Sequence, residues 1–569
     1  MKYILKYELD KENITKDILK KKGIKDPEKY IIGSELDEYK PEMLDNIEKA
    51  CYNIINHLKK GSKIYLQPDS DLDGYMSSAI FYNYIKTISP NIEIVWQVHD
   101  GKHHGINLNF IPDDVSLAVF PDSATNNIKE HKLLKEMRID VLVLDHHLAD
   151  EISQDAIIVN NQLCEYPNKY LSGGGITYKF IEMMDKILGI HESQKFIDLA
   201  AVSIIGDMMD LREYENRSII KRGLSNIQNI GLKQLIEQQS YSIGDITKLT
   251  PTAIAFYIVP LVNAIIRVGT EAEKSLLFEA FIGGDKIIPS TKRGDKGNFE
   301  TVAQQAVRNC VNARSRQNRL KDKAIEDLDI KIQKNELFKN QIIFVNVEDN
   351  ETFDSTLTGL IAMNFLTKYK KPTIVARLNN DGFWRGSARG SNSTELKDLK
   401  KFFGESKLFE YVEGHQNAFG LSIHTDNVEK LIDYSNTKLK DVEFNENVYE
   451  VDLIYSSKEN FETTIKELNE LKSIWGQGVE EPTIVVKDIQ LFPEDVSFIG
   501  QNKDTVKFIY NNITYIRFKD TNLINKIKSC KNGFSITILG KANCNEWGGN
   551  ITSQILIDDY IIKDTSNIF

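Results

Sequence analysis

Apolar runs of strand length alternate with amphipathic segments of helix length through the first half of the chain. The runs at 64–66, 115–120 and 139–144 are mostly apolar without alternation, which is typical of strands buried on both faces of a parallel sheet. Helical patterns, such as the one at 75–88, lie between these runs. The alternation predicts an α/β domain with a doubly wound parallel sheet over residues 46–230.

The pattern changes in the rest of the chain. A charged, helix-leaning lead-in at 1–45 precedes the α/β domain, and a mainly helical region at 231–334 follows it. Helix and strand patterns alternate again at 335–440, which predicts a smaller α/β domain. Short strands of irregular spacing dominate 441–569. At 569 residues the chain exceeds one hydrophobic core, which favours several domains.

Carboxylates and imidazoles stand where the apolar runs end. The carboxyl ends of parallel strands line the edge at which open α/β sheets bind ligands. Neighbouring carboxylates repel each other unless a cation neutralises them, so the pattern favours an oxygen-rich site for Mg²⁺ or Mn²⁺. The alternative is that Asp merely ends strands because turns favour it. The residues are Asp69, Asp71 and Asp73 in DSDLDG, Asp122 in PDS, Asp145, His146 and His147 in DHH, and Asp207.

These motifs, together with SGGGITYKF and IIGDMMDLREYENR, resemble the phosphoesterase motifs of the DHH superfamily in the order of RecJ-type single-strand exonucleases. The resemblance implies two Mn²⁺ or Mg²⁺ ions, with Asp122 bridging them. It implies Asp69, Asp71, Asp122, His146 and Asp207 as ligands, and Asp73, Asp145 and His147 as catalytic residues beside the phosphate or behind the ligands. RecJ-type sequences commonly have a histidine at the position of Gln67. The carbonyl oxygen of a glutamine is a weaker ligand for Mn²⁺ than an imidazole.

Two further segments are candidates for phosphate or nucleic-acid contact. Gly173 and Gly175 precede a helical pattern, so their N–H groups can approach a phosphate closely, although a bare glycine triplet is more often a turn. Between Arg308 and Lys323, six cations face one acid, giving a local charge of +5. This stretch, with Arg308, Arg314 and Arg316, predicts either a DNA-binding helix face or a solvated one. The resemblance implies a long linking helix here and favours DNA contact.

A histidine-rich stretch, HDGKHHG, follows the strand-like run at 92–98. Its His99, His103 and His104 fit no compact metal site by their spacing, so we expect a solvated loop. RecJ-type relatives have a basic loop here that faces the scissile phosphate, and the histidines stand where an arginine is expected.

Two strings near the C-terminal half resemble the signatures of the DHH-associated domain of RecJ-type proteins. They are FWRGSARGSNS and EGHQNAFGLSI, with Ser387, Arg389, Gly414 and His415 at the matching positions. An Arg beside Gly and Ser can hold a phosphate bidentately. Directionality requires a site that recognises the strand end, and we expect Ser387, Arg389 and His415 to form it. Further on, IWGQGVEEP and NEWGGNITSQILIDDYII resemble the C-terminal OB-like domain of the same family.

Composition narrows the class further. The chain is 41% hydrophobic and 27% charged, as in ordinary soluble proteins, and its net charge of −11 argues against bulk electrostatic coating of nucleic acid. Five scattered cysteines support neither a disulfide framework nor a zinc site. The sequence shows no run of 18 apolar residues and no signal-peptide pattern, so we expect a cytoplasmic protein with no membrane association.

The sequence therefore predicts a metal-dependent 5'→3' exonuclease acting on single-stranded DNA in recombination, repair or replication. Two alternatives stay open: a DHH phosphodiesterase for short oligonucleotides or cyclic dinucleotides, and a non-catalytic RecJ-like replication scaffold. By resemblance, single-strand-binding protein and a helicase are expected partners.

Overall fold

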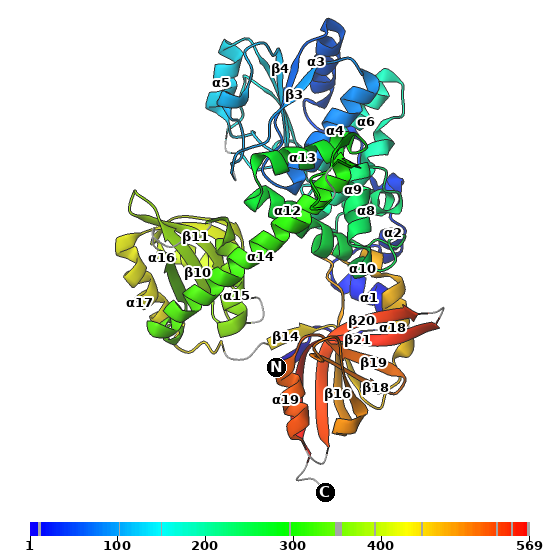
Figure 1. Cartoon of the computed structure of the whole chain (residues 1–569), viewed down its shortest axis with the longest axis vertical. Coiled ribbons are helices and arrows are strands. Elements are labelled where there is room, and N and C mark those ends of the chain that lie inside the picture. The colour runs from blue at the N-terminus through cyan, green and yellow to red at the C-terminus, as the bar shows by residue number, and fades with distance from the viewer. Residues whose placement is uncertain are drawn as a thin grey trace. The chain divides into compact units, whose positions relative to one another are not determined.

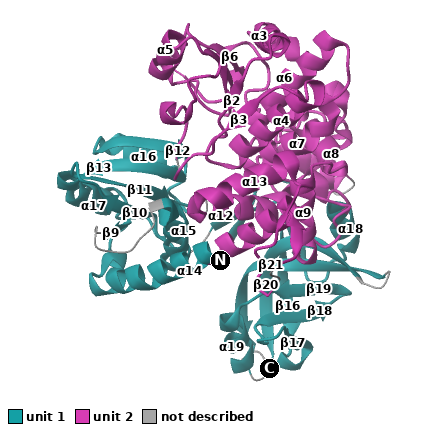
Figure 2. Ribbon diagram, turned by 45° about the horizontal axis from the view of Figure 1, so that its top comes forward, with its two compact units in different colours: residues 1–10, 316–469, 482–569 teal, residues 11–315, 470–481 magenta. Residues whose placement is uncertain are grey.

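The computed structural model describes residues 1–9, 13–101, 103–149, 151–294, 297–347, 355–391, 394–444, 448–530, 533–547 and 550–565. The chain forms two compact units (Figure 2). One comprises residues 11–315 and 470–481, and the other comprises 1–10, 316–469 and 482–569. The helical region expected as a separate domain thus joins the α/β domain as far as Ser315.

The unit of residues 11–315 is built on a five-stranded parallel sheet with the order β3-β2-β4-β5-β6. Alternate residues of each strand face two different cores, as Val119 and Phe120 do. Helices α3, α4 and α6 pack on one face and α5 on the other, which confirms the doubly wound α/β fold (Figure 1). The bounds are β2 Ile64–Leu66, β3 Ile94–Trp96, β4 Leu117–Pro121, β5 Asp140–Asp145, β6 Ile157–Asn160, α3 Ile47–Lys60, α4 Leu72–Ile88, α5 Ile128–Glu136 and α6 Gly173–Leu188.

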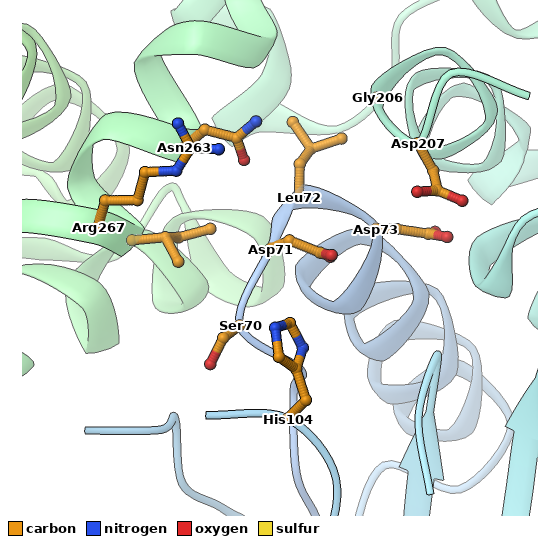
Figure 3. Close-up of a pocket in the computed structure, with 10 residues that line it drawn as sticks. Ser70, Asp71, Leu72, Asp73, His104, Gly206, Asp207, Asn263 and Arg267 are labelled. Atoms are coloured by element: carbon orange, nitrogen blue, oxygen red, sulfur yellow. The ribbon is translucent and has the colours of Figure 1, made fainter. Parts of the chain in front are cut away.

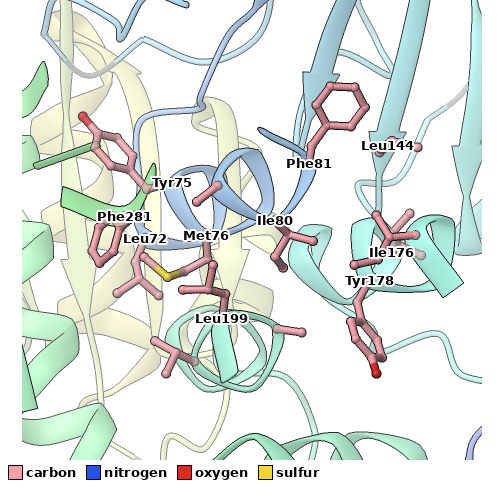
Figure 4. Close-up of a cluster of buried hydrophobic side chains, with 14 of the residues drawn as sticks. Leu72, Tyr75, Met76, Ile80, Phe81, Leu144, Ile176, Tyr178, Leu199 and Phe281 are labelled. Atoms are coloured by element: carbon pink, nitrogen blue, oxygen red, sulfur yellow. The ribbon is translucent and has the colours of Figure 1, made fainter. Parts of the chain in front are cut away.

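Helix α4 lies in the middle of the main hydrophobic core (Figure 4). Met76, Ile80 and Phe81 of this helix are fully buried, and the Phe81 ring stacks on Phe180 of α6 with centroids 6.1 Å apart. Because α4 begins inside the motif DSDLDG, this packing fixes the position of the acidic residues at its start.

Mainly helical structure completes the unit, as predicted. A β-hairpin that the sequence did not predict, β7 (Ile287–Pro289) with β8 (Phe299–Thr301), precedes the 33-residue helix α14. The helices are α1 Ile14–Lys21, α2 Pro27–Ile32, α7 Ile197–Gly206, α8 Tyr214–Ser225, α9 Ile230–Gln238, α10 Ser240–Ile243, α11 Pro251–Ala253, α12 Val259–Val268, α13 Glu271–Gly283 and α14 Val302–Lys334. Within the described residues, the stretch Pro251–Val268 alone is long and apolar enough to cross a membrane, and half of it is buried as in a core helix.

The predicted smaller α/β domain has a five-stranded sheet of order β12-β13-β11-β10-β9. Helix α15 packs on one face through Ile361 and Phe365, and α16 packs on the other through Phe403. The bounds are β9 Ile343–Val347, α15 Thr358–Tyr369, β10 Thr373–Leu378, β11 Phe383–Arg389, α16 Leu399–Ser406, β12 Phe409–His415, β13 Ala418–His424 and α17 Val428–Lys438.

The C-terminal β-rich region has a seven-stranded sheet of order β15-β16-β20-β21-β19-β18-β17. The expectation of short strands is wrong for β20 and β21, which contain 14 and 15 residues and form one long hairpin. From the lead-in, β1 (Lys2–Leu5) pairs in parallel with β14 (Val448–Val451). The other elements are β15 Leu453–Ser456, α18 Glu462–Glu470, β16 Thr483–Leu491, β17 Val496–Ile499, β18 Thr505–Tyr510, β19 Ile513–Arg517, α19 Thr521–Ser529, β20 Phe534–Trp547 and β21 Asn550–Asp564.

Candidate metal centre and nucleic-acid contacts

The acidic residues lie at the carboxyl edge of the parallel sheet. The Asp71 side chain caps α4, where its Oδ1 accepts a hydrogen bond from the Gly74 N–H at 2.9 Å. Glycine is required at position 74 because a Cβ there would lie 2.7 Å from the Asp69 Cα. The contributions are Asp69 and Asp71 after β2, Asp122 after β4, His146 and His147 after β5, and Asp207 at the C-cap of α7.

Three overlapping groups of ligand atoms form at this edge, and within each group the atoms lie within 4.8 Å of one another. The His146 Nε2 lies 3.2 Å from Asp122 Oδ1 and 3.4 Å from Asp207 Oδ2. The groups are Asp69, Asp71 and Asp122; Asp73, His146 and Asp207; and Asp122, Asp145, His146 and His147. The fold therefore brings all five predicted ligands together, with Asp122 shared between two groups.

The carboxyl groups of this cluster disfavour one another's charge. Burial and the charges of Asp73 and Asp71 raise the pKa of Asp122 well above its ordinary value. Burial and the charge of Asp69 also raise the pKa of Asp71. Burial and the charge of Asp73 raise the pKa of Asp207 to about 8. A bound cation would reverse these shifts because it favours the ionised carboxylates.

Two buried atoms fit such a cation. Within the described part of the chain, Asp122 Oδ1 and His146 Nε2 are buried without a hydrogen-bond partner, although buried polar atoms normally have one. Asp122 also has a φ of 65°, a left-handed conformation that costs free energy in a residue other than glycine. Carboxylate oxygens with one imidazole nitrogen are a donor set suited to Mn²⁺ or Mg²⁺.

Asp145 positions His147. The Asp145 Oδ1 lies 2.7 Å from His147 Nδ1, and its Oδ2 accepts hydrogen bonds from the Thr125 N–H at 3.1 Å and Oγ1 at 2.6 Å. Burial alone would raise the pKa of Asp145, but its hydrogen bond with His147 holds it below the usual range. Burial would lower the pKa of His147, but the same hydrogen bond raises it to about 9. Asp145, predicted as catalytic, therefore orients the neighbouring imidazole.

The prediction that Gly173 and Gly175 bind phosphate through their amides is wrong in this structure. The N–H groups of Gly173 and Gly174 donate to the two oxygens of Asp73, at 2.8 Å and 2.9 Å. The Gly175 N–H donates to Ser172 Oγ at 3.2 Å. The anion at the N-terminus of α6 is thus the Asp73 carboxylate, which was predicted as catalytic and is fixed here among the candidate ligands.

The expectation of a solvated loop is wrong for His99, whereas His104 is exposed as expected. His99 is 4% exposed, and its Nε2 lies 3.0 Å from Gln67 Nε2. Gln67 Oε1 accepts a hydrogen bond from the Asn107 N–H at 3.2 Å, so this side chain holds the loop at both of its amide atoms. The His104 Nδ1 lies 2.5 Å from Asp69 Oδ2. The loop therefore closes onto a candidate metal ligand.

A cavity of about 200 Å³ opens onto the acidic cluster (Figure 3). Two polar residues of α12, Asn263 and Arg267, line it, and the sequence analysis missed both. Burial and the charge of Arg314 lower the pKa of Arg267, whereas the charge of Asp71 raises it. The available signal was a pair of polar residues four positions apart in the otherwise apolar helix VPLVNAIIRV. Such a pair lies on one helix face. The remaining lining includes His104, Asp71, Asp73 and Asp207.

The basic residues of α14 do not share one role. Arg308 binds Glu300, with Nη2 2.7 Å from Oε1, and its Nη2 also donates to Thr291 Oγ1 at 2.9 Å. The nucleic-acid role predicted for Arg308 is therefore not supported, because its guanidinium anchors the β7–β8 hairpin. Arg314 lies close enough to Arg267 for its charge to act on it. Arg316 is partly buried, and its role stays a prediction.

The signatures of the smaller domain meet on one sheet surface. Strand register pairs Arg389 with Ala418, and Ala418 with His415, so these side chains form one cross-strand row. The Ser387 Oγ lies 3.0 Å from Thr358 Oγ1 at the start of α15. A Cβ at Gly359, also in the first turn of α15, would lie 2.4 Å from Arg389 Nη2. This polar surface, formed by Ser387, Arg389 and His415, adjoins a helix N-terminus, which favours anions.

Gly414 was predicted as a phosphate-binding residue together with Ser387, Arg389 and His415. Its backbone conformation explains why a glycine stands here. Its φ is 128°, and a Cβ there would lie 2.9 Å from the Phe419 Cα of the paired strand. The structure therefore requires glycine at this position for strand pairing.

Comparison with known proteins identifies the family. Residues 63–204 match the DHH family, N-terminal domain, and residues 451–559 match the RecJ OB domain. The chain is 37% identical over 547 residues to a Bacillus subtilis protein named "Putative SPbeta prophage-derived single-strand DNA-specific exonuclease YorK", covering 95% of this chain and 94% of that one. It is 24% identical to the single-stranded-DNA-specific exonuclease RecJ of the same organism, covering 94% and 66%. The chain belongs to the RecJ family of single-strand DNA-specific exonucleases.

The solved structures agree on the fold. Thermus thermophilus RecJ in complex with Mn²⁺ superposes with a TM-score of 0.70 at 16% identity, covering 98% of this chain and 79% of that one. The same protein in complex with Mg²⁺ gives a TM-score of 0.65 at 15% identity, covering 98% and 78%.

Proposed function

We propose that this protein is a metal-dependent 5'→3' exonuclease that hydrolyses the phosphodiester bonds of single-stranded DNA. The observation that carries the proposal is the buried acidic cluster, in which Asp122 Oδ1 and His146 Nε2 face each other at 3.2 Å without a hydrogen-bond partner among the described residues. Family membership and the Mn²⁺ and Mg²⁺ complexes of the Thermus relative support it.

Two Mn²⁺ or Mg²⁺ ions would be held by Asp69, Asp71, Asp122, His146 and Asp207, with Asp122 shared. When bound, such ions would supply an activated water for in-line attack and would stabilise the leaving oxygen. Asp145 holds His147 by its Nδ1, so that the other ring nitrogen, Nε2, can meet the phosphate. The cavity also places Arg267 and Asn263 where they can donate hydrogen bonds to a phosphate or a sugar.

The direction of cleavage requires a second contact. A metal site cuts any phosphodiester that it is offered, so the strand end must be recognised separately. We assign this role to Arg389, Ser387 and His415. The Arg389 guanidinium can bind a terminal phosphate with two hydrogen bonds, and Ser387 at the start of α15 can add a third.

The cellular setting follows from the same proposal. A nuclease of this kind acts in the cytoplasm on strands exposed during recombination, repair or replication. Single-strand-binding protein and a helicase are the partners that would present such strands.

The test is a nuclease assay on one DNA strand labelled at either end, with Mn²⁺ and with Asp122→Asn as the inactive control. Early release of labelled mononucleotide from the 5' end is expected. Early release from the 3' end would overturn the polarity. Cleavage of only very short oligonucleotides or cyclic dinucleotides would favour the small-substrate alternative. Stoichiometric Mn²⁺ binding without hydrolysis would indicate a scaffold.

A further inference from the structure

The β7–β8 hairpin has one buried face and one exposed face. On the buried face, Ile288 packs against a cluster formed by Ala280 of α13 and by Val302, Ala303 and Ala306 of α14. The Glu300 carboxylate on the same face is held by Arg308 of α14. These contacts with α14 hold the hairpin in place, so the position of its outer face is fixed.

The outer face is apolar and unusually exposed. Strand register pairs Pro289 with Phe299 and Ile287 with Thr301, so these four side chains share one face. The Phe299 side chain is 69% exposed and Ile287 is 60% exposed. Large apolar side chains clustered at such exposure mark interaction sites.

Cations flank this apolar face. Lys286 precedes β7, and Lys292 and Arg293 follow it, all three exposed. Residues 285–301 contain four cations and three acids, and one of these acids, Glu300, is paired with Arg308, in a chain whose net charge is −11. The combination of an exposed aromatic ring with flanking cations matches single-stranded nucleic acid, whose bases stack on aromatic rings while its phosphates attract cations. A duplex does not offer its base faces in this way.

We propose that the outer face of the β7–β8 hairpin, formed by Ile287, Pro289 and Phe299 with Lys286, Lys292 and Arg293, is a binding site for single-stranded nucleic acid. Phe299 stacks on a base, and Lys292 and Arg293 contact the phosphates on either side of it. The inference rests on the proposed exonuclease function and extends it. The site would bind the substrate strand without taking part in its hydrolysis.

The test measures binding of a fluorescein-labelled oligothymidine to the full chain in EDTA, where no hydrolysis occurs. Phe299→Ala should weaken binding about 10-fold, the effect of losing one stacked base. Tyr241→Ala, which removes an aromatic side chain that is 100% exposed, is the matched control and should leave binding unchanged. The double variant Lys292→Ala, Arg293→Ala should reduce the slope of log affinity against log salt by about 1.4, or 0.7 for each phosphate contact.

Phe299→Trp keeps a stacking ring and adds a fluorescent probe. It should retain wild-type affinity, and oligothymidine should quench its emission. Wild-type affinity in Phe299→Ala, or no quenching in Phe299→Trp, would overturn the proposal, and the second result would point to a protein partner for this face. These outcomes leave hydrolysis untouched. Conversely, the wild type could bind DNA without hydrolysing it while Phe299→Ala loses binding. This result would overturn the proposed exonuclease function and support the binding site.

Discussion

The acidic cluster and the polar surface of β11–β13 differ in how far their geometry is fixed before any substrate arrives. Asp122 is 1% exposed and is held by the strained turn that follows β4. His415 is exposed on an edge strand of its sheet. A buried cluster cannot rearrange around a lost ligand, whereas an exposed surface loses only the contact removed. We therefore expect mutations in the first region to abolish chemistry and those in the second to change substrate preference.

Loss of Asp122 should have the largest effect. Asp122→Ala removes the carboxylate shared between two groups of ligands, and we expect about a 1,000-fold lower rate, or roughly 4 kcal/mol in the barrier. Single-turnover hydrolysis of a labelled strand measures it. Asp113→Ala, at an exposed position on the approach to β4, is the control. A variant that keeps more than about a tenth of the wild-type rate would rule out the shared-ligand role.

Metal binding should stabilise the protein through the acidic cluster and not through the polar surface of Ser387, Arg389 and His415. Mn²⁺ at about 100 times its dissociation constant should add about 2.7 kcal/mol to the free energy of unfolding of the wild type. Thermal unfolding with and without Mn²⁺ measures this shift. Asp122→Asn should lose the shift, but without metal it should be at least as stable as the wild type, because it removes one repelling carboxylate. If metal-free Asp122→Asn unfolded more easily than the metal-free wild type, repulsion between the carboxylates would not be the dominant effect of Asp122 on stability.

The two regions also differ in how well the sequence predicts them. Asp69, Asp71, Asp122 and His146 stand in short motifs at the ends of strand-like runs, so the strand pattern alone places them at one sheet edge. Asp207 ends the helix α7, and the packing of that helix brings it to the same edge. Arg267 and His104 reach the same cavity through the packing of α12 and the closure of a loop. The spacing of Asn263 and Arg267 indicates a polar helix face, but no local pattern shows which site that face meets. Gly173 precedes a helix as predicted, but its N–H binds an aspartate from a segment 100 residues away. Sequence separation, rather than residue type, limits the prediction.

Arg389 tests the exposed region. Arg389→Ala should lower the rate on 5'-phosphorylated strands about 10-fold, because a charge-assisted hydrogen bond contributes about 1.5–3 kcal/mol. Strands with a 5'-hydroxyl should be cut almost as fast as by the wild type, so the preference between the two substrates narrows. Arg377→Ala, on the neighbouring strand β10, serves as the control. An equal loss on both substrates would mean that Arg389 supports the fold and does not read the strand end.

The smallest effect should come from α14, whose basic residues the sequence could not divide into roles. The charge of Arg314 lowers the pKa of Arg267 at the cavity, whereas Arg308 is bound to Glu300. The double variant Arg314→Ala, Arg316→Ala should weaken single-strand binding and reduce its salt slope by up to about 1.4, because each phosphate contact on a single strand contributes about 0.7. Binding in EDTA over a series of salt concentrations measures the slope. Lys331→Ala together with Lys334→Ala, at the far end of the same helix, removes the same charge and should leave the slope unchanged. An equal change in both double variants would show that α14 attracts DNA only through its total charge, and the division of this helix into separate roles would fail.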